Sequence, residues 1–431
     1  MIQFEMRPLR QPLDATVRVP GSKSLTNRAL VAAAPARGTS TLTNVLIAED
    51  TRHMAQLLRD LGLAVSLDQA RTLAIVAGCG GHIPAGEADL FCAAAGTVMR
   101  FGTALCALGH GRYRLDGVPR MRHRPLGDLV EALRRLGAAV EYEGQEGFPP
   151  LTVHARGLGG GSAIFERPAS SQMVSALLLA SPGARGDVFI EVHGGLVSRP
   201  YVAMTLSVME AFGVIFLEEA MSRFIVPAPQ TYQARHYAVE PDASNASYFL
   251  AAAAVAGGRV TVEGLGTESV QGDARFVDRL EQMGCSVVRG PNRLAVRGPP
   301  PGSRLRAINV DLNDMPDMVQ TLAVLALFAD GPTRIRNVAN LRLKETDRLA
   351  ALGTELSRLG AQVELYEDGL VVIPPKQIEP AYVQTYDDHR MAMSFSLACL
   401  TTDGMVVTGT ECVRKTFPDF FDRFRAMCGV A

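Results

Sequence analysis

The amino-acid sequence predicts an α/β protein of two inside-out domains, each made of three repeated βαβαββ units with buried parallel helices. Three observations support this prediction: a helical stretch that recurs six times, the regular spacing of the glycines that end it, and the alternation of two kinds of helix. Repetition at a fixed period outranks any local prediction of secondary structure, because each copy must fold as the same supersecondary unit.

The first kind of helix is small, apolar on all sides and introduced by Gly, Ser or Asp. "GSKSLTNRALVAAAPARG" (21–38) and "AAGTVMRFGTALCALGHG" (94–111) are two of its six copies. The copies end 72 to 75 residues apart, at Gly38, Gly111, Gly186, Gly258, Gly331 and Gly404. A helix without a polar face is buried, so we expect these helices inside each domain.

The second kind of helix is amphipathic and precedes a strand, as in "LRDLGLAV" (58–65). Its copies also end on glycine, at Gly62, Gly137, Gly213, Gly284 and Gly360. Glycine after the last helical turn is a common C-terminal cap, which predicts five capped, half-exposed helices. Apolar β-branched runs such as "RTLAIVAG" (71–78) close each unit as strands.

The sixth copy stops after its second helix, and the N-terminal strand around "DATVRVP" (14–20) is predicted to complete it. The predicted domains are therefore 21–241 for the first three units, and 1–20 with 242–431 for the last three.

Composition restricts the function. The chain has 431 residues, a net charge of −1 and no long basic run, which argues against nucleic-acid and membrane-surface partners. No stretch reaches about 20 apolar residues, and the N-terminus lacks a signal-peptide core. The seven cysteines form no CxxC pair, so we expect neither a metal site nor disulfides, and a cytoplasmic location.

Lysine is scarce. Of 43 cationic residues only Lys23, Lys344, Lys376 and Lys415 are lysines. Lysine supplies a compact point charge where arginine supplies a planar fork, so a lysine in such a chain can mark a functional site. Codon bias is the alternative explanation.

Polar residues collect at the starts of the repeated helices and in nearby loops: "GSKSLTNRA" (21–29), "AGTVMR" (95–100), "GVPRMRHRP" (117–125), "SSQ" (170–172), "SRPY" (198–201), "NLRLKETDRL" (340–349), "DDHRMAM" (387–393) and "KTFPDFF" (415–421). Each segment alone is explained by helix capping or a solvated loop. Their recurrence at one end of repeated helices instead indicates an anion site, because helix N-termini carry free N–H groups and partial positive charge.

Together these segments closely resemble the EPSP synthase family of enolpyruvyl transferases, over about residues 12–425. The resemblance implies attack of the 5-hydroxyl of shikimate 3-phosphate on phosphoenolpyruvate, with loss of phosphate, in the shikimate pathway to chorismate and aromatic amino acids. It implies no cofactor and no metal, small-molecule partners only, and a monomer. Glyphosate is the family's competitor for the phosphoenolpyruvate site.

The resemblance also implies the site residues. Those expected to hold shikimate 3-phosphate are Lys23, Ser24, Arg28, Ser170, Ser171, Gln172, Ser198, Tyr201, Asp317, Asn340 and Lys344. Those expected to hold phosphoenolpyruvate are Lys23, Gly96, Arg120, Gln172, Arg348, Arg390 and Lys415. Asp317 and Glu345 are the implied proton-transfer pair, with Lys23 and Lys415 assisting at the departing phosphate.

One position departs from the family pattern: Ala94 stands where the family usually has Asn, so one contact to phosphoenolpyruvate is absent or replaced. The related UDP-N-acetylglucosamine enolpyruvyl transferases are the alternative, but they carry a reactive cysteine near the position of Arg120, and residues 107–284 contain none. A non-catalytic anion-binding scaffold is a second alternative, against which the paired acids Asp317 and Glu345 argue.

Overall fold

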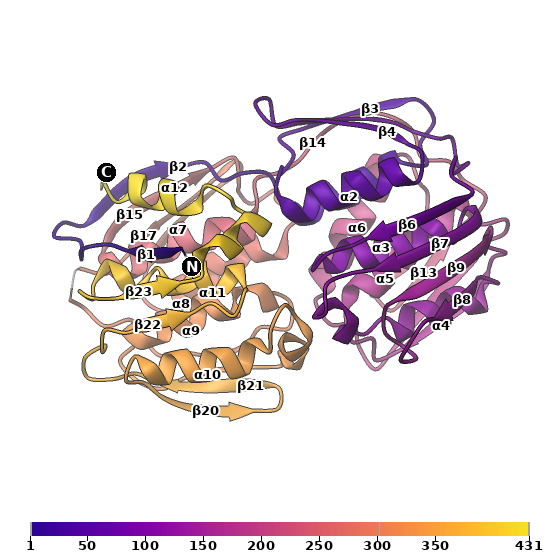
Figure 1. Ribbon diagram of the computed structural model, residues 1–431. Coiled ribbons are helices and arrows are strands. Elements are labelled where there is room, and N and C mark those ends of the chain that lie inside the picture. Colours follow the sequence, from indigo (N-terminus) through magenta and orange to yellow (C-terminus); the bar gives the residue numbers. More distant parts are fainter. Residues whose placement is uncertain (1, 301, 430–431) are drawn as a thin grey trace. The chain divides into compact units, whose positions relative to one another are not determined.

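The computed structural model describes residues 2–300 and 302–429 (Figure 1). The chain divides into two compact units: unit 1 is Met1–Pro20 with Glu240–Ala431, and unit 2 is Gly21–Val239. The sequence places the second domain boundary after residue 241, and the units divide after residue 239.

Unit 2 contains repeats one to three. Repeat one comprises α1 (Lys23–Ala33), β3 (Thr39–Thr43), α2 (Glu49–Asp60), β4 (Ala64–Asp68), β5 (Leu73–Ala77) and β14 (His236–Ala238). Repeat two comprises β6 (Glu87–Phe91), α3 (Gly96–Cys106), β7 (His110–Asp116), η1 (Met121–His123), α4 (Gly127–Arg135), β8 (Ala139–Tyr142) and β9 (Leu151–Arg156). Repeat three comprises β10 (Gly161–Glu166), α5 (Ser171–Ala180), η2 (Ser181–Gly183), β11 (Val188–His193), α6 (Arg199–Ala211), β12 (Leu217–Glu219) and β13 (Arg223–Val226).

Unit 1 contains repeats four to six. Repeat four comprises β2 (Leu13–Val17), α7 (Ala243–Ala256), β15 (Gly258–Glu263), η3 (Gly272–Arg275), α8 (Phe276–Gln282), β16 (Ser286–Gly290) and β17 (Arg293–Arg297). Repeat five comprises β18 (Asn309–Asp311), η4 (Pro316–Met318), α9 (Val319–Leu325), η5 (Ala326–Phe328), β19 (Thr333–Arg336), η6 (Ala339–Leu343), α10 (Arg348–Arg358), β20 (Gln362–Tyr366) and β21 (Gly369–Ile373). Repeat six comprises β22 (Tyr382–Gln384), α11 (His389–Phe395), η7 (Ala398–Leu400), β23 (Val406–Thr408), η8 (Thr410–Lys415), α12 (Phe420–Met427) and β1 (Gln3–Glu5).

The described residues form six sheets of one design. A leading strand runs parallel to its neighbour, as β6 does to β7, and an antiparallel strand flanks that neighbour on the other side, as β9 does. Five sheets add a fourth strand, and the sheet β1–β23–β22 has three. This repetition confirms the predicted fold class.

The N-terminal strands correct one prediction. The strand predicted around 14–20 is β2, and it pairs in parallel with β15 of repeat four rather than completing repeat six. Repeat six is completed by β1, which runs antiparallel to β23. The reason is an exchange of leading strands: β14 precedes α7 in the chain but pairs with β3 of repeat one, which leaves repeat four to be led by β2.

The two kinds of helix have the predicted burial. Every residue of α3 is buried, and in α7 only Val255 is not. Buried helices pack on one another within each unit, α3 on α5 and α7 on α9. The amphipathic helices α2, α4, α8 and α10 are followed by the predicted glycines, whose φ angles lie between 87° and 102°. A side chain would strain the backbone there, so glycine caps these helices.

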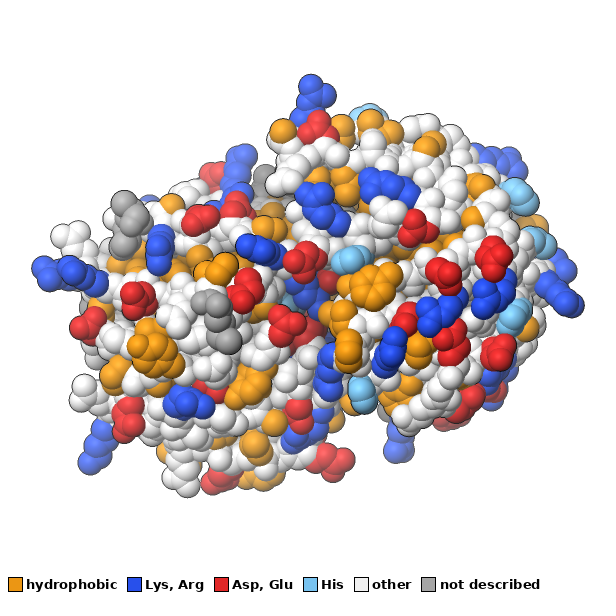
Figure 2. Space-filling model, viewed as in Figure 1, with side chains coloured by type: hydrophobic (Ala, Val, Ile, Leu, Met, Phe, Trp, Pro, Cys, Tyr) orange, Lys and Arg blue, Asp and Glu red, His pale blue; other side chains and the backbone are white. Residues whose placement is uncertain are grey.

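Charges of both signs mix on the surface. Figure 2 shows acidic and basic side chains interspersed over the viewed face of unit 2. Within unit 2, ion pairs such as Arg114–Glu143 and Arg122–Asp116 link neighbouring elements. No helix formed by the described residues has the length and apolar character needed to span a membrane.

Candidate active site

In unit 2 the first polar cluster lies at the N-terminal end of α1. Ser22 caps the helix, its Oγ accepting a hydrogen bond from the Leu25 N–H at 3.4 Å. Lys23 opens the helix, and its Nζ lies 3.4 Å from Asp50 Oδ2. One turn later, Arg28 Nη1 donates to the Ser24 carbonyl at 2.9 Å, so Ser24 and Arg28 share a helical face as predicted.

Arg28 is a fully buried cation surrounded by neutral groups. Its Nε donates to Thr205 Oγ1 at 2.7 Å, its Nη2 donates to the Tyr201 carbonyl at 2.9 Å, and its guanidinium lies 5.3 Å from the centre of the Phe101 ring. Burial lowers the pKa of Arg28 to about 10. No carboxylate among the described residues pairs with Arg28. An anionic ligand would therefore supply the counter-charge that this buried cation lacks.

A second cluster surrounds Gly96 at the start of α3. A Cβ at Gly96 would lie 2.6 Å from Arg124 Nη2 and 2.9 Å from Arg100 Nη1, so two guanidinium groups converge on this glycine. Both arginines are buried. Arg124 Nη1 donates to the Ala94 carbonyl at 3.0 Å, and Arg100 donates to Pro125 O and Gln172 Oε1 at 2.7 and 3.3 Å.

Arg100 and Arg124 are not among the site residues predicted from the sequence. A charged residue inside an apolar helix indicates a functional residue, and on this ground Arg390 is predicted as a ligand. Arg100 also lies inside an apolar helix, so the same argument applies to it. The sequence cannot distinguish Arg124 from Arg120 and Arg122, because the three arginines alternate along one loop. The structure buries Arg124, whereas Arg120 is half-buried at the start of η1; Arg120 stays a predicted ligand.

The third cluster of unit 2 comes from repeat three. Ser170 caps α5 by accepting from the Gln172 N–H at 3.3 Å, and Ser171 is buried. Ser198 is buried in the left-handed region (φ 56°) just before α6. Tyr201 joins the Arg28 network through its carbonyl. All the predicted residues of unit 2 except Arg120, which precedes the 3-10 helix η1, therefore lie at the starts of α-helices or in contact with residues there.

In unit 1 the centre of the site is Arg348, the first residue of α10. It is 1% exposed and donates to three carboxylates: Asp388 at 2.7 Å, Glu345 at 2.9 Å and Asp317 at 3.0 Å. Burial alone would lower the pKa of Arg348, but the three carboxylates outweigh it and raise the pKa above its usual value.

Two further cations hold the predicted proton-transfer pair. Arg390 Nη2 donates to Asp317 Oδ2 at 2.6 Å, and Lys415 Nζ donates to Glu345 Oε1 at 3.0 Å. Asp317 thus lies between Arg348 and Arg390, while Glu345 lies between Arg348 and Lys415. The structure brings all five predicted residues into one hydrogen-bonded network.

Asp388 and Tyr248 belong to this network although neither was predicted as a site residue. Asp388 caps α11 by accepting from the Arg390 N–H at 2.9 Å. The Tyr248 hydroxyl accepts from Arg390 Nη1 at 3.3 Å, and burial raises the pKa of Tyr248 to about 12 against the opposing effect of Arg390. Tyr248 lies inside α7 with no charged neighbour in sequence, so only the fold reveals it.

Lys344 and Asn340 lie in the segment that leads into α10. Lys344 follows η6 and is half-buried. The Asn340 Oδ1 is buried and has no hydrogen-bond partner among the described residues. A buried acceptor of this kind is costly unless a ligand donates to it. Nowhere in the described ranges do three His, Cys, Asp or Glu side chains gather in a group that could hold a metal ion.

The two units differ in their electrostatics. In unit 2 the buried guanidinium groups of Arg28 and Arg124 contact neutral oxygens within the described chain, which suits them to bind anions. In unit 1 the cations are paired with carboxylates, which suits that cluster to combine charge stabilisation with proton transfer.

A family model described as EPSP synthase (3-phosphoshikimate 1-carboxyvinyltransferase) matches residues 9–424. The chain belongs to the EPSP synthase family. A curated EPSP synthase family protein of Trichormus variabilis, "3-phosphoshikimate 1-carboxyvinyltransferase", is 51% identical over 421 residues, covering 98% of each chain. One of the same description from Vibrio vulnificus is 46% identical over 433 residues, covering all of each chain.

Solved structures agree with this EPSP synthase assignment. An EPSP synthase of Acinetobacter baumannii superposes with a TM-score of 0.80 at 26% identity, covering 97% of this chain and 96% of the other. A second structure from the same organism gives 0.81 at 25% identity, covering 99% and 98%. The family and the fold predicted from the sequence are therefore confirmed, and the UDP-N-acetylglucosamine alternative is not favoured.

Proposed function

We propose that the polar clusters of both units bind the two substrates of the family reaction and move its protons. The reaction is that of 3-phosphoshikimate 1-carboxyvinyltransferase (EC 2.5.1.19): the enolpyruvyl group of phosphoenolpyruvate is transferred to the 5-hydroxyl of shikimate 3-phosphate, with release of phosphate, in the shikimate pathway. Both substrates are small molecules that carry a phosphate and a carboxylate.

The observation that supports these roles most strongly is the pair of carboxylates in unit 1, each held by two cations. In the addition step the 5-hydroxyl oxygen bonds to carbon 2 of phosphoenolpyruvate, its proton leaves to a base, and the methylene carbon takes up a proton. In the elimination step the new methyl group loses a proton as the carbon–phosphate oxygen bond breaks. Two groups that exchange protons are therefore needed, and Asp317 and Glu345 fill that need.

Asp317 accepts hydrogen bonds from two arginines, which fixes its orientation as the acceptor of the 5-hydroxyl proton. Glu345 must carry a proton before it can give one to the methylene carbon. The 3.0 Å hydrogen bond from Lys415 Nζ to Glu345 Oε1 is a path along which a proton can reach that carboxylate. We assign Lys415 and Lys23 to the departing phosphate, because a compact ammonium on a flexible stem can stabilise the negative charge that develops on the phosphate.

In unit 2 we assign Arg28, Ser24, Ser170, Ser171, Ser198 and Tyr201 to shikimate 3-phosphate. We assign Gly96, Arg120 and Gln172 to phosphoenolpyruvate, and we add Arg124 and Arg100, because both guanidinium groups reach Gly96. Two converging arginines supply fixed positive charge where Ala94 has lost the family's usual amide. From unit 1, Asp317, Asn340 and Lys344 complete the shikimate 3-phosphate set, and Arg348, Arg390 and Lys415 complete the phosphoenolpyruvate set. Lys23 and Gln172 are assigned to both substrates.

Phosphate release in the presence of phosphoenolpyruvate tests this proposal. We expect turnover with shikimate 3-phosphate as acceptor and none with UDP-N-acetylglucosamine. The variants Asp317→Asn and Glu345→Gln should each lower kcat by about 100-fold or more, the scale of a lost general acid or base. Glu364→Gln, an exposed carboxylate on β20, is the matched control and should leave kcat unchanged. Near-normal kcat in both site variants would refute the assignment of the pair.

We also propose that the enzyme acts as a cytoplasmic monomer without cofactor or metal. The charge balance and the absence of a CxxC pair support the location and the lack of a metal. Light scattering tests the monomer and should give the mass of a single 46.1 kDa chain.

A further inference from the structure

A cavity of about 410 Å³ lies in unit 1, away from the candidate active site. It is lined by Val255 near the end of α7, by Leu327 and Phe328 in η5, and by residues 401–403 just after η7. The cavity thus lies where the three buried helices of unit 1 end, whereas Asp317 and Arg390 lie where two of them begin. A helix of the length of α7 spans about 20 Å, so the two sites are distinct.

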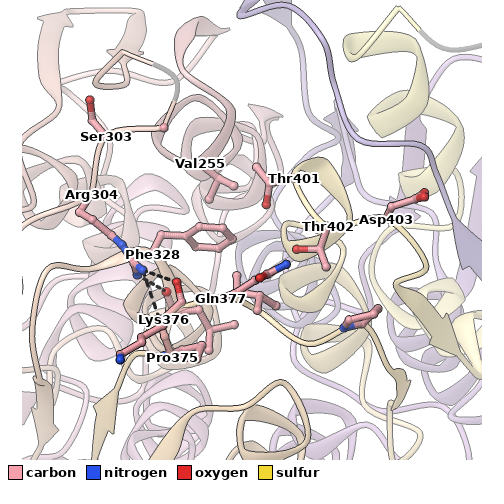
Figure 3. Close-up of a pocket in the computed structure, with 14 residues that line it drawn as sticks. Val255, Ser303, Arg304, Phe328, Pro375, Lys376, Gln377, Thr401, Thr402 and Asp403 are labelled. Atoms are coloured by element: carbon pink, nitrogen blue, oxygen red, sulfur yellow. Dashed lines mark hydrogen bonds between the residues drawn. The ribbon is translucent and has the colours of Figure 1, made fainter.

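The two sides of the cavity carry opposite charge. Figure 3 shows Arg304 and Lys376 on one side and Thr401, Thr402 and Asp403 on the other, with Phe328 and Val255 between them. Lys376 is the one scarce lysine that the proposed reaction does not use. Because its flexible stem has four carbons, its ammonium can reach over the rim.

Neither Lys376 nor Asp403, the charged residues on the two sides of the cavity, is neutralised by another described residue. Lys376 and Asp403 form no ion pair with any other residue that the structure describes. Arg304 donates to four carbonyls, those of Leu327, Ala329, Pro375 and Lys376, at 2.9 to 3.4 Å. These bonds hold the side chain of Arg304 in place and use both of its terminal nitrogens. Lys376 is therefore the cation on this side whose ammonium can turn toward a ligand.

The acidic side has further negative character. Asp403 follows the C-terminal end of the helix formed by α11 and η7, where the helix dipole is negative and cations are favoured. The hydroxyls of Thr401 and Thr402 add hydrogen-bond acceptors beside it. An ammonium group fits this side, a carboxylate fits the side of Lys376, and an apolar body fits between them against Phe328.

We propose that this cavity binds a small dipolar molecule whose ammonium and carboxylate are separated by an apolar spacer. Its volume lies within the usual range of small-molecule sites. An α-amino acid, in which the two charges are adjacent, does not match charged groups that lie on opposite sides. This inference does not rest on the proposed catalytic residues, since none of them lines the cavity.

Two isomers provide the test. 4-(Aminomethyl)benzoate carries its charges at opposite ends of a ring, and phenylglycine has the same formula with its charges adjacent. We would titrate each into the full chain and follow the δ1-methyl resonance of Ile378, which lines the cavity. We expect saturable binding of 4-(aminomethyl)benzoate with a dissociation constant of about 1 mM or lower, a typical efficiency for so few atoms, and at least tenfold weaker binding of phenylglycine.

Charge variants make the test specific. Lys376→Glu and Asp403→Lys should each weaken binding of 4-(aminomethyl)benzoate at least tenfold, and the double variant should recover binding, because the ligand can bind in the reverse orientation. Arg306→Glu, exposed in the same segment and outside the cavity lining, is the matched control and should bind normally. Phosphate release should be unchanged in all of these variants.

Three results would overturn the proposal: no saturable shift of Ile378 at concentrations tenfold above the expected constant, equal affinity for the two isomers, or equal loss of binding in Arg306→Glu and Lys376→Glu. None of these results bears on catalysis, so failure here is distinguishable from failure of the proposed function.

Discussion

Replacing Arg28 with methionine should make the unliganded protein more stable while it destroys substrate binding. The pKa of Arg28 is lowered from 12.5 to about 10 by burial. Each pKa unit corresponds to 1.36 kcal/mol, so holding this charge inside the protein costs about 3 kcal/mol. Because the folded-state pKa is the lower one, the cost is present in full below about pH 10 and is relieved as the pH rises toward 12.5. At pH 7 the whole cost applies.

Removing the guanidinium leaves its partners satisfied. Thr205 Oγ1 can still donate its one proton either to Ser175 Oγ at 2.8 Å or to the Tyr201 carbonyl at 3.1 Å, and the Tyr201 carbonyl itself lies inside α6. The Ser24 carbonyl remains inside α1. Methionine fills a similar volume without charge, and replacing a buried ionic group by an apolar one is often neutral or stabilising. We therefore expect the unfolding free energy to rise by about 1–3 kcal/mol, which for a unit of this size raises Tm by about 2–10 °C.

Differential scanning calorimetry at pH 7 without ligand measures this change. Arg37→Met, at an exposed position, removes the same charge without relieving burial and should leave Tm within about 1 °C. With shikimate 3-phosphate the order should reverse: the wild type gains Tm and Arg28→Met does not, while kcat/KM falls by about 100-fold or more. A lower Tm in unliganded Arg28→Met, or a normal KM, would refute this reasoning.

Three further outcomes are expected. Lys23→Arg and Lys415→Arg should each lower turnover at least tenfold, about 1.4 kcal/mol of transition-state stabilisation, in the phosphate-release assay; turnover within twofold of the wild type in both would contradict a point-charge role. Glyphosate should inhibit the wild type in the micromolar range and Gly96→Ala at least tenfold less, because the added methyl meets guanidinium nitrogens closer than 3.0 Å; equal inhibition would place this glycine outside the pocket. Asp388→Asn should lower the free energy of unfolding, measured in urea, by about 3 kcal/mol, as expected for a broken buried ion pair. Asp387→Asn, at the exposed neighbouring position, should leave it unchanged. Equal urea midpoints for the two variants would contradict the prediction.

The sequence was a good guide to what depends on local pattern. The all-apolar helices, the amphipathic helices and the glycines that cap them follow from side-chain periodicity and backbone sterics within about ten residues, and Gly62 or Gly360 has the positive φ that its position predicts. The charged network around Arg348 could also be anticipated, because burying its members apart would be costly.

What the sequence could not specify is pairing over long distances. Nothing in "LDATV" distinguishes an edge position beside β15 from one beside β23, because both sites accept a short half-buried strand. Arg124 was missed for a related reason: the loop sequence shows that three arginines are present, and only the packing around Gly96 selects which one is buried.

The exchange of leading strands has a consequence for biosynthesis. β1 and β2 leave the ribosome before unit 2, but they belong to sheets whose other strands are made only after unit 2: Gln3 pairs with Thr408, and Leu13 with Gly258. Unit 2 lacks nothing once Val239 has emerged, since β14 is its final strand, so it can fold while the chain is still growing. β1 and β2 remain unpaired while unit 2 is made and folds, and their exposed strand edges are ones that a nascent-chain chaperone would cover. Moving residues 1–20 to the C-terminus by circular permutation would end the wait, and would make the second half of the protein independent of the first in its order of assembly.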